Sequence, residues 1–258
     1  MYPKKSLGQN FLTAESVVDL IIDAGDVISD DTVLEIGPGK GMLTKKLLRI
    51  AEKVVAVEKD DDLFELLKES FKKEIKMNKL DLIHGDILEF DASRFEVLDY
   101  KLIANIPYNI TGQIIRQFLS SSFQPKQMVL MVQKEVAERI VAKNQKESVL
   151  SLSVKAYGEP VYIKTVKAGS FFPVPSVDSA VLSVQNISKN FFAEFNEEKF
   201  FDILHAGFKS KRKKLSSNLS TLVNKEKIKS VFEKLEIDDN TRAEDVPMGM
   251  WKKIVAGI

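Results

Sequence analysis

The segment 104–111, ANIPYNIT, places an amide, a proline and an aromatic ring directly after the apolar run KLIA, residues 101–104. Asn105 contributes an amide oxygen, Ile106 a backbone carbonyl, and Pro107 a rigid backbone without an N–H donor. Two such oxygens can accept hydrogen bonds from one amine, and the ring of Tyr108 can stack on a flat heterocycle. The alternative is an ordinary loop at the end of a strand.

A glycine-rich segment, VLEIGPGKGMLT, follows an apolar run and precedes a helical pattern. Gly37, Gly39 and Gly41 permit a tight turn and let a ligand approach the backbone closely. A nicotinamide fingerprint would place the third glycine one residue later, and Pro38 stiffens this loop. The spacing therefore predicts a ligand without phosphates, and a purely structural turn is the alternative.

Two carboxylates follow the next two apolar runs. Glu58 lies 21 residues after Gly37, where a carboxylate can accept hydrogen bonds from both hydroxyls of a ribose. Asp86 can accept a hydrogen bond from the amino group of adenine. The alternatives are a surface charge for Glu58 and a simple turn former for Asp86. With the glycine loop, these carboxylates predict a nucleoside pocket without phosphate clamps, which indicates S-adenosylmethionine as the cofactor.

Methyl transfer to the exocyclic amine of adenine would use residues 105–108 directly. This nitrogen is a poor nucleophile because its lone pair is delocalised into the ring. The Asn105 side-chain oxygen and the Ile106 carbonyl can accept its two N–H groups and stabilise the positive charge that grows on nitrogen in the transition state. Pro107 keeps these acceptors aimed, and no general base is required because water can take the proton afterwards.

A second aromatic pair lies in SFFPVPSVDSAV, residues 170–181. Two prolines hold an extended loop there, ahead of the last predicted strand. One of the two phenylalanines should close over the adenine opposite Tyr108, and the other should pack in the core. We expect Phe171 to face the base and Phe172 to be the core residue.

The elements that position these residues follow an alternating pattern. Strands are predicted at 32–37, 53–58, 80–85, 100–105, 127–133, 160–166 and 179–185. Helical patterns such as 41–52 and 62–75 lie between them, with apolar residues three and four positions apart. This alternation predicts an α/β domain over residues 1–185, with a doubly wound, mostly parallel sheet of seven strands.

After residue 186 the strand signal ends, and four short amphipathic patterns predict a small all-helical domain over 186–258. This segment carries 14 Lys+Arg against 11 Asp+Glu. The cations of KSKRKK, residues 209–214, cluster at what reads as the start of a helix. We expect them to contact nucleic-acid phosphates, and a solvated helix start is the alternative.

Composition excludes several classes of site. The chain of 258 residues has no cysteine, which excludes disulfides, thiolate metal sites and cysteine nucleophiles. Its two histidines make a His-based metal centre unexpected, so we expect no metal. No apolar run approaches the roughly 20 residues of a membrane-spanning helix, and MYPKKSLGQNFL lacks the apolar core of a signal peptide. We therefore expect a cytoplasmic protein.

Six ordered motifs resemble those of the ribosomal RNA adenine N6,N6-dimethyltransferases: KKSLGQNFL, VLEIGPGKGMLT, VAVEKD, GDIL, ANIPYNIT and FFPVPSVDSAV. The resemblance spans residues 4–183 and continues more weakly through HAGFKSKRKKLSSNL and TRAEDV. It implies a class I, Rossmann-like methyltransferase domain that uses S-adenosylmethionine, followed by a helical domain that helps dock on RNA. Ser176 is a departure, since the family usually has Lys there to contact a phosphate.

The resemblance and the patterns together predict three groups of site residues. The expected cofactor-binding residues are Asn10, Leu12, Gly37, Gly39, Gly41, Glu58, Asp86, Ile87 and Asn105, of which Asn10 and Leu12 rest on the resemblance alone. The expected catalytic residues are Asn105, Ile106, Pro107, Tyr108 and Phe171. The expected RNA-binding residues are Lys4, Lys5, Lys209, Lys211, Arg212, Lys213 and Lys214.

The resemblance implies transfer of methyl groups to N6 of two adjacent adenosines near the 3′ end of small-subunit ribosomal RNA during subunit maturation. VDSAV, FKSKRKKLSSNL and RAEDV favour this branch over methylation of a large-subunit adenosine, which confers macrolide resistance. A non-catalytic assembly factor is a further alternative, and a nicotinamide dehydrogenase is a weaker one. The expected partner is the immature small subunit, with the chain acting as a monomer and without a membrane.

Overall fold

The structure is a computed structural model, and it describes residues 3–4, 7–94 and 99–258. The chain divides into two compact units: unit 1 is Met1–Ala137 with Glu159–Ile187, and unit 2 is Glu138–Gly158 with Ser188–Ile258. The predicted boundary near residue 186 lies close to the last of the three points where the chain passes from one unit to the other, between residues 187 and 188. The prediction that residues 138–158 belong to the first domain is wrong, because Tyr157 donates a hydrogen bond to Glu197 (2.6 Å) and stacks its ring edge against Phe192 in unit 2.

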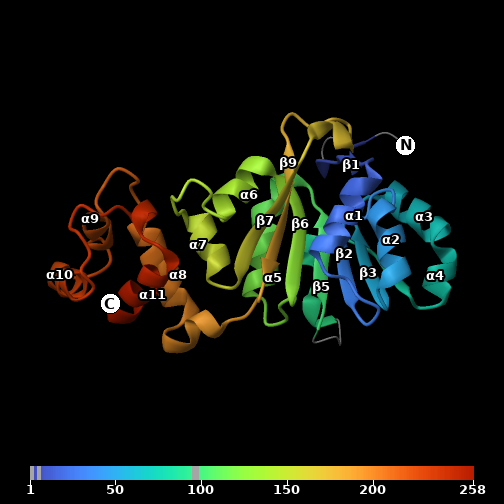
Figure 1. Cartoon of the computed structure of the whole chain (residues 1–258). Helices are drawn as coiled ribbons and strands as arrows, with labels where there is room; N and C mark the ends of the chain where they lie inside the picture. Colours follow the sequence, from blue (N-terminus) through green and yellow to red (C-terminus); the bar gives the residue numbers. More distant parts are fainter. Residues whose placement is uncertain (1–2, 5–6, 95–98) are drawn as a thin grey trace. The chain divides into compact units, whose positions relative to one another are not determined.

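Unit 1 contains a mixed sheet with the strand order β4-β3-β2-β5-β6-β9-β7 (Figure 1). Neighbouring strands from β4 to β6 are parallel, and β9 is antiparallel to both β6 and β7. The strands are β2 (Thr32–Ile36), β3 (Lys53–Glu58), β4 (Leu80–His84), β5 (Lys101–Asn105), β6 (Gln127–Gln133), β7 (Glu159–Val166) and β9 (Ser179–Gln185). All seven predicted strands and the mostly parallel sheet are therefore confirmed.

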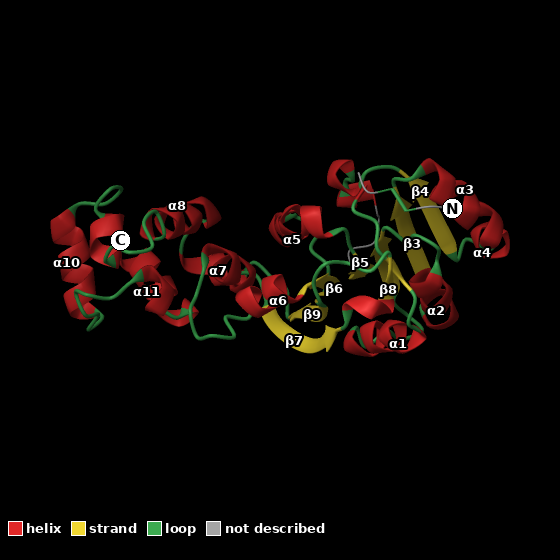
Figure 2. Ribbon diagram, turned by 90° about the horizontal axis from the view of Figure 1, so that it is seen from above, coloured by secondary structure: helices red, strands yellow, loops and turns green. Residues whose placement is uncertain are grey.

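Helices cover both faces of this sheet, and Figure 2 shows α1 and α2 on one face with α5 on the other. The helices are α1 (Glu15–Ala24), α2 (Met42–Ile50), α3 (Asp61–Ser70), α4 (Lys72–Lys76), α5 (Thr111–Ser120) and α6 (Lys134–Ile140). Alternate residues of the inner strands point to the two faces, so that Val33 packs with α1 and α2 in one core cluster. The central strands are buried on both sides, as the apolar runs predicted.

A two-stranded ladder outside the main sheet was not predicted. β1 (Phe11–Leu12) pairs antiparallel with β8 (Phe171–Phe172), with Phe11 opposite Phe172 and Leu12 opposite Phe171. Each strand has two residues, too few for an alternating pattern to stand out in the sequence. The ladder holds the segment before α1 against the loop before β9.

Unit 2 is helical in the part of the chain that the structure describes. Its helices are α7 (Val149–Lys155), α8 (Glu197–Gly207), α9 (Leu215–Leu219), α10 (Lys225–Lys234) and α11 (Met248–Gly257). Trp251 on α11 is fully buried and stacks on Phe208 with ring centroids 5.7 Å apart. All four amphipathic patterns predicted after residue 186 form helices. The basic run 209–214 is a loop between α8 and α9, so its prediction as the start of a helix is wrong.

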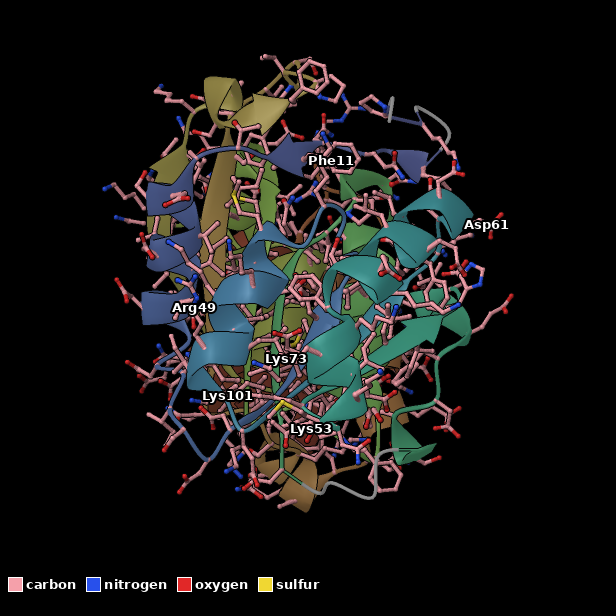
Figure 3. All side chains as sticks on the ribbon, turned by 90° about the vertical axis from the view of Figure 1, so that its right-hand side faces the viewer. Phe11, Arg49, Lys53, Asp61, Lys73 and Lys101 are labelled. Atoms are coloured by element: carbon pink, nitrogen blue, oxygen red, sulfur yellow. The ribbon has the colours of Figure 1, made fainter. Side chains whose placement is uncertain are left out.

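The parallel strands of unit 1 begin at one edge of the sheet and end at the opposite edge. Figure 3 shows Lys53 and Lys101, the first residues of β3 and β5, at one edge, and Phe11 and Asp61 at the opposite edge. The second edge is where the parallel strands end, and ligands of open α/β sheets bind there. Over the described residues, no helix has the length and apolarity needed to cross a membrane.

Candidate active site

A cavity of about 210 Å³ opens where β2, β3, β4 and β5 end. Most of the predicted site residues line it, namely Asn10, Leu12, Gly37, Gly39, Glu58, Asp86, Ile87, Asn105, Ile106, Pro107 and Tyr108. The predicted Gly41 and Phe171 are not among the lining residues. The structure thus brings together strand ends that are up to about 70 residues apart in sequence, as parallel crossovers require.

The glycine loop leaves room for a ligand at its first glycine. Gly37 has a φ of +62°, and no atom lies within 4 Å of the position that a Cβ would take there. Gly39 also has a positive φ and packs against the ring of Phe11. Gly41 differs, because a Cβ there would lie 2.6 Å from the ring of Phe71. The expected role of Gly41 in the cofactor pocket is therefore corrected to a role in packing α2 against the core.

Glu58 is buried at the end of β3, with 5% of its surface exposed. Its Oε2 accepts a hydrogen bond from the Gly39 N–H (3.1 Å), and its Oε1 accepts one from the Asp60 N–H (2.9 Å). Burial raises the pKa of Glu58, and these backbone hydrogen bonds only partly oppose it. Each carboxylate oxygen retains a second lone pair, so Glu58 can also accept a ligand hydroxyl.

Asp86 combines its turn-forming role with a place in the cavity wall. Its Oδ1 accepts a hydrogen bond from the Leu88 N–H (3.0 Å), and its Oδ2 pairs with Lys59 Nζ (2.6 Å). The hydrogen bond from Lys59 lowers the pKa of Asp86. Asp86 therefore stays ionised at neutral pH, and Lys59 is the cation that it neutralises at this end of the cavity.

Glu35 lines the same cavity and was missed by the sequence analysis. It is 2% exposed on β2, and its Oε2 has no hydrogen-bond partner among the described residues. Burial raises the pKa of Glu35 to about 8. The available signal was an acidic residue inside an otherwise apolar buried strand, VLEIG, because buried carboxylates are rare without a function.

Asn105 ends β5 at the cavity, and its amide has a defined partner. Its Nδ2 donates a hydrogen bond to the backbone carbonyl of Asn10 (3.1 Å). An amide that donates through nitrogen on one side presents its oxygen on the other. The Asn105 Oδ1 is therefore the atom available as an acceptor in the cavity.

Tyr108 follows in a short 3₁₀ turn, Tyr108–Ile110, and its ring is half-buried in the cavity wall. Its hydroxyl lies 2.5 Å from the Oγ of Ser179, the first residue of β9. Burial raises the pKa of Tyr108. The ring is thus held at its far end by a neutral hydrogen bond, and Tyr108 lines the same cavity as Asn105.

The two phenylalanines of β8 have the reverse of their predicted environments. Phe171 is 2% exposed and belongs to the core cluster, whereas Phe172 is 53% exposed. Phe171 lies opposite Leu12 in the β1–β8 ladder and Phe172 lies opposite Phe11, and neighbouring residues of a strand point to opposite faces, so only one of the two rings can enter the core. The expectation that Phe171 is presented to a base is therefore wrong.

The predicted RNA-binding cations fall into three groups. Lys4 is paired with Asp60 (2.9 Å) and Asp62 (2.8 Å), and its expected contact with RNA stays a prediction. Lys5 lies outside the described residues. The five cations of the 209–214 loop in unit 2 are all exposed, and within the described chain they have no carboxylate partner at ion-pair distance: Lys209, Lys211, Arg212, Lys213 and Lys214.

No set of three or more His, Asp or Glu side chains in the described ranges is placed to hold a metal ion. The cavity also has few groups for a phosphate, because Lys40 and Lys59 are its only lysines in the described structure and Lys59 is paired with Asp86. Three carboxylates face the ligand space instead, those of Glu35, Glu58 and Asp86. These oxygens can accept hydrogen bonds from ligand hydroxyls and amines.

A family model and several curated proteins match nearly the whole length of the chain. The family model described as "Ribosomal RNA adenine dimethylase" matches residues 2–258. A protein of Dehalococcoides mccartyi named "Ribosomal RNA small subunit methyltransferase A" is 41% identical over 97% of this chain and 87% of its own length. A protein of the same name from Fusobacterium nucleatum is 37% identical over 98% of this chain and 96% of its own length.

Two solved structures have the same fold over nearly the whole chain. The crystal structure of a dimethyladenosine transferase from Plasmodium falciparum has a TM-score of 0.83 and 29% identity, and the match covers 95% of each chain. The 23S rRNA methyltransferase ErmE has a TM-score of 0.79 over 96% of this chain and 99% of its own. Its identity is 21%, so this second likeness concerns the fold alone.

Proposed function

The chain belongs to the ribosomal RNA adenine dimethylase family, and from this we propose that it transfers methyl groups to N6 of two adjacent adenosines near the 3′ end of small-subunit ribosomal RNA. Its curated relatives at 37% and 41% identity are small-subunit methyltransferases, which supports this branch. The large-subunit and non-catalytic alternatives are not favoured by these relatives. With this substrate, we further propose that the protein acts in the cytoplasm on maturing small subunits.

We propose S-adenosylmethionine as the cofactor, because the cavity fits its chemistry. When bound, this cofactor would supply a methyl group on a positively charged sulfur. Glu58 would accept hydrogen bonds from ribose hydroxyls, and Asp86 would accept one from the adenine amino group. The open space at Gly37 would admit the ligand against the backbone, and Glu35, whose raised pKa keeps it mostly protonated at neutral pH, would offer a buried carboxyl group for hydrogen bonding.

The observation that carries the catalytic proposal is the orientation of the Asn105 amide. Because its Nδ2 is held by the Asn10 carbonyl, its Oδ1 can accept one N–H of the target amine. The carbonyl of Ile106, in the same cavity wall, would accept the other. Both dipoles stabilise the positive charge that develops on the nitrogen as the new N–C bond forms. Pro107 restricts the backbone between these acceptors and Tyr108.

Stacking would complete the binding of the target adenine. Tyr108 lines the same cavity as Asn105, and its neutral hydroxyl is held by Ser179. We propose Phe172 as the second aromatic, because it is exposed and lies opposite Phe11, which lines the cavity, in the β1–β8 ladder. Stacking of one base on an aromatic side chain is worth about 1–3 kcal/mol.

Docking on RNA is assigned to unit 2 in this proposal. The loop 209–214 presents five exposed cations between α8 and α9. Asn218 on α9 is 3% exposed, and its Nδ2 donates hydrogen bonds to the carbonyls of Gly207 (2.6 Å) and Ser210 (3.0 Å). These hydrogen bonds hold the start of the loop to α9, and the five cations of the loop are exposed to solvent.

A methyl-transfer assay tests the proposed function. Small subunits that lack the modification are incubated with the protein and S-adenosylmethionine labelled in its methyl group. We expect label in the small-subunit RNA with the wild-type protein and a loss of at least about 100-fold with Asn105→Ala. Transfer of no label by the wild-type protein, or equal transfer by both proteins, would contradict the proposal.

A further inference from the structure

Asp60 joins two parts of unit 1 that border the cavity. It is 3% exposed and lies between β3 and α3. Its Oδ1 accepts hydrogen bonds from the N–H groups of Asp62 (3.0 Å) and Leu63 (3.2 Å) and so caps α3. The same carboxylate accepts hydrogen bonds from Lys4 Nζ (2.9 Å, Oδ1) and Gln9 Nε2 (2.9 Å, Oδ2). One buried group therefore caps a helix and also binds the N-terminal segment.

That segment forms one wall of the cavity. Residues 7–12, here called the strap, all line it. At its start, Gln9 is held by Asp60 and also accepts a hydrogen bond from the Lys4 N–H (2.7 Å). At its end, the strap pairs with β8 through the β1 ladder. Between these two attachments lies Asn10, whose carbonyl binds the Asn105 amide.

The position of this carbonyl decides which atom Asn105 presents to the cavity. A target amine donates hydrogen bonds, so it needs Oδ1 and would be repelled by the N–H groups of Nδ2. The Asn10 carbonyl accepts from Nδ2 and thereby selects the useful orientation. If the strap moved, the amide would lose the partner that distinguishes its two ends.

We propose that Asp60 is a positioning residue for methyl transfer: it fastens the strap through Lys4 and Gln9, and the strap orients the Asn105 amide. This inference rests on the role proposed above for Asn105. It gives Lys4 a part in the fastening. Although burial alone would raise the pKa of Asp60, hydrogen bonds from Lys4 and Gln9 bring it below its ordinary value, so the fastening carboxylate is ionised at neutral pH.

The test uses Asp60→Asn in the full-length protein. Asparagine still caps α3 through its oxygen, but its NH₂ group cannot accept the Gln9 hydrogen bond and it carries no charge for Lys4. Because small displacements of reacting groups have large effects on rate, we expect kcat to fall about 10- to 100-fold. Affinity for S-adenosylhomocysteine, measured by calorimetry, should change much less than kcat. An unchanged kcat would overturn the proposal.

Asp62→Asn is the matched control, since Asp62 also pairs with Lys4 but has a side chain that is 62% exposed and makes no described contact with Gln9. We expect its kcat to equal that of the wild type. Gln9→Ala removes the hydrogen bond from the strap to Asp60 and leaves Asp60 in place to cap α3. Its kcat should fall as in Asp60→Asn, and this variant tests the proposal even if Asp60→Asn folds poorly. Wild-type kcat in Gln9→Ala would overturn the proposal.

A double-mutant cycle separates this inference from the proposed function. If Asp60 acts through Asn105, Asp60→Asn should lower single-turnover methyl transfer in the wild-type background and have little further effect in Asn105→Ala. Equal fold-losses in both backgrounds would overturn the positioning role. Full activity of Asn105→Ala alone would instead refute the proposed function, because the residue being positioned would then have no catalytic part.

Discussion

At the scale of single residues, the proposed chemistry depends on which end of the Asn105 amide faces the cavity. Asn105 has donors at one end and an acceptor at the other, and a nearby backbone carbonyl fixes which end faces the cavity. The proposed mechanism needs no titrating base, because the target nitrogen would lose its proton only after it has been methylated. Histidine is accordingly absent from the cavity wall as the structure describes it.

Replacement of Asn105 by alanine should therefore affect the rate more than the fold. We expect kcat to fall by about 10²–10³-fold, the usual effect of removing one oriented group that stabilises transition-state charge. Affinity for S-adenosylhomocysteine should fall by a smaller factor. Single-turnover kinetics and calorimetry measure these two effects separately, and a loss confined to cofactor affinity would contradict the catalytic role.

Glu35 gives a prediction for pH dependence. The folded protein raises the pKa of this carboxyl from 4.5 to about 8 because it is buried. Between these values the folded state binds more protons than the unfolded state, so the Glu35 contribution to stability is complete below pH 4.5 and is lost as pH rises through 8. The loss can reach about 1.4 kcal/mol per pH unit.

Glu35→Gln should remove this slope, because glutamine does not titrate. Urea unfolding between pH 5 and about 9 would show the free energy of unfolding of the wild type falling more steeply with pH than that of the variant. Parallel curves for the two proteins would show that Glu35 does not carry the raised pKa.

Phe172→Ala should weaken binding of the target base without affecting the core. Because the side chain is 53% exposed, we expect a change in the free energy of unfolding of less than about 0.5 kcal/mol. The KM for RNA should rise by about 5- to 100-fold, as expected for the loss of one stacking partner. Exposed Val174 provides a matched control on the same loop, and an equal effect of Val174→Ala would argue against specific stacking.

At the scale of elements, the glycine loop separates into a ligand side and a packing side. Gly37→Ala adds a methyl group in open space in the cavity, so it should lower affinity for S-adenosylhomocysteine while costing about 1–2 kcal/mol of stability from its positive φ. Gly41→Ala has the same backbone cost and also meets the Phe71 ring at 2.6 Å. We expect it to destabilise the protein more and to leave the affinity of the folded protein unchanged, as thermal unfolding and calorimetry would show.

The strands and helices were predictable because long apolar runs and helical spacing are local signals. The strap was not, since the contacts of Lys4 and Gln9 with Asp60 span more than 50 residues and leave no periodic pattern. The choice between Phe171 and Phe172 also depended on a register that only the β1–β8 pairing sets. The 209–214 run appeared helical because lysine and arginine favour helices, whereas Asn218 holds the start of this segment as a loop.

At the scale of the whole molecule, the proposed catalytic and RNA-docking sites belong to different units. Unit 1 holds the cavity, and the exposed cations of the 209–214 loop belong to unit 2. The division was only partly predictable, because residues 138–158 lie between strands of the sheet in sequence but belong to unit 2. Their helical pattern alone does not distinguish a helix that covers the sheet from one that packs elsewhere.

Replacement of Lys211, Arg212 and Lys213 by alanine should act on RNA binding alone. If each contacts a phosphate, the slope of log affinity against log salt should flatten by about 2 to 3. Affinity for S-adenosylhomocysteine should not change. The same number of substitutions at Lys72, Lys73 and Lys76 on α4 controls for net charge, and an equal effect of both triple variants would contradict a specific docking loop.

The central claim is that this cavity methylates a pair of adenosines through Asn105. The most direct measurement maps methyl groups on ribosomal RNA by mass spectrometry in cells that lack the protein and are complemented with the wild type or with Asn105→Ala. We predict N6,N6-dimethyladenosine at two adjacent positions near the 3′ end of small-subunit RNA with the wild type and its absence with the variant. Restoration of both marks by Asn105→Ala, or marks placed on large-subunit RNA by the wild type, would contradict this account.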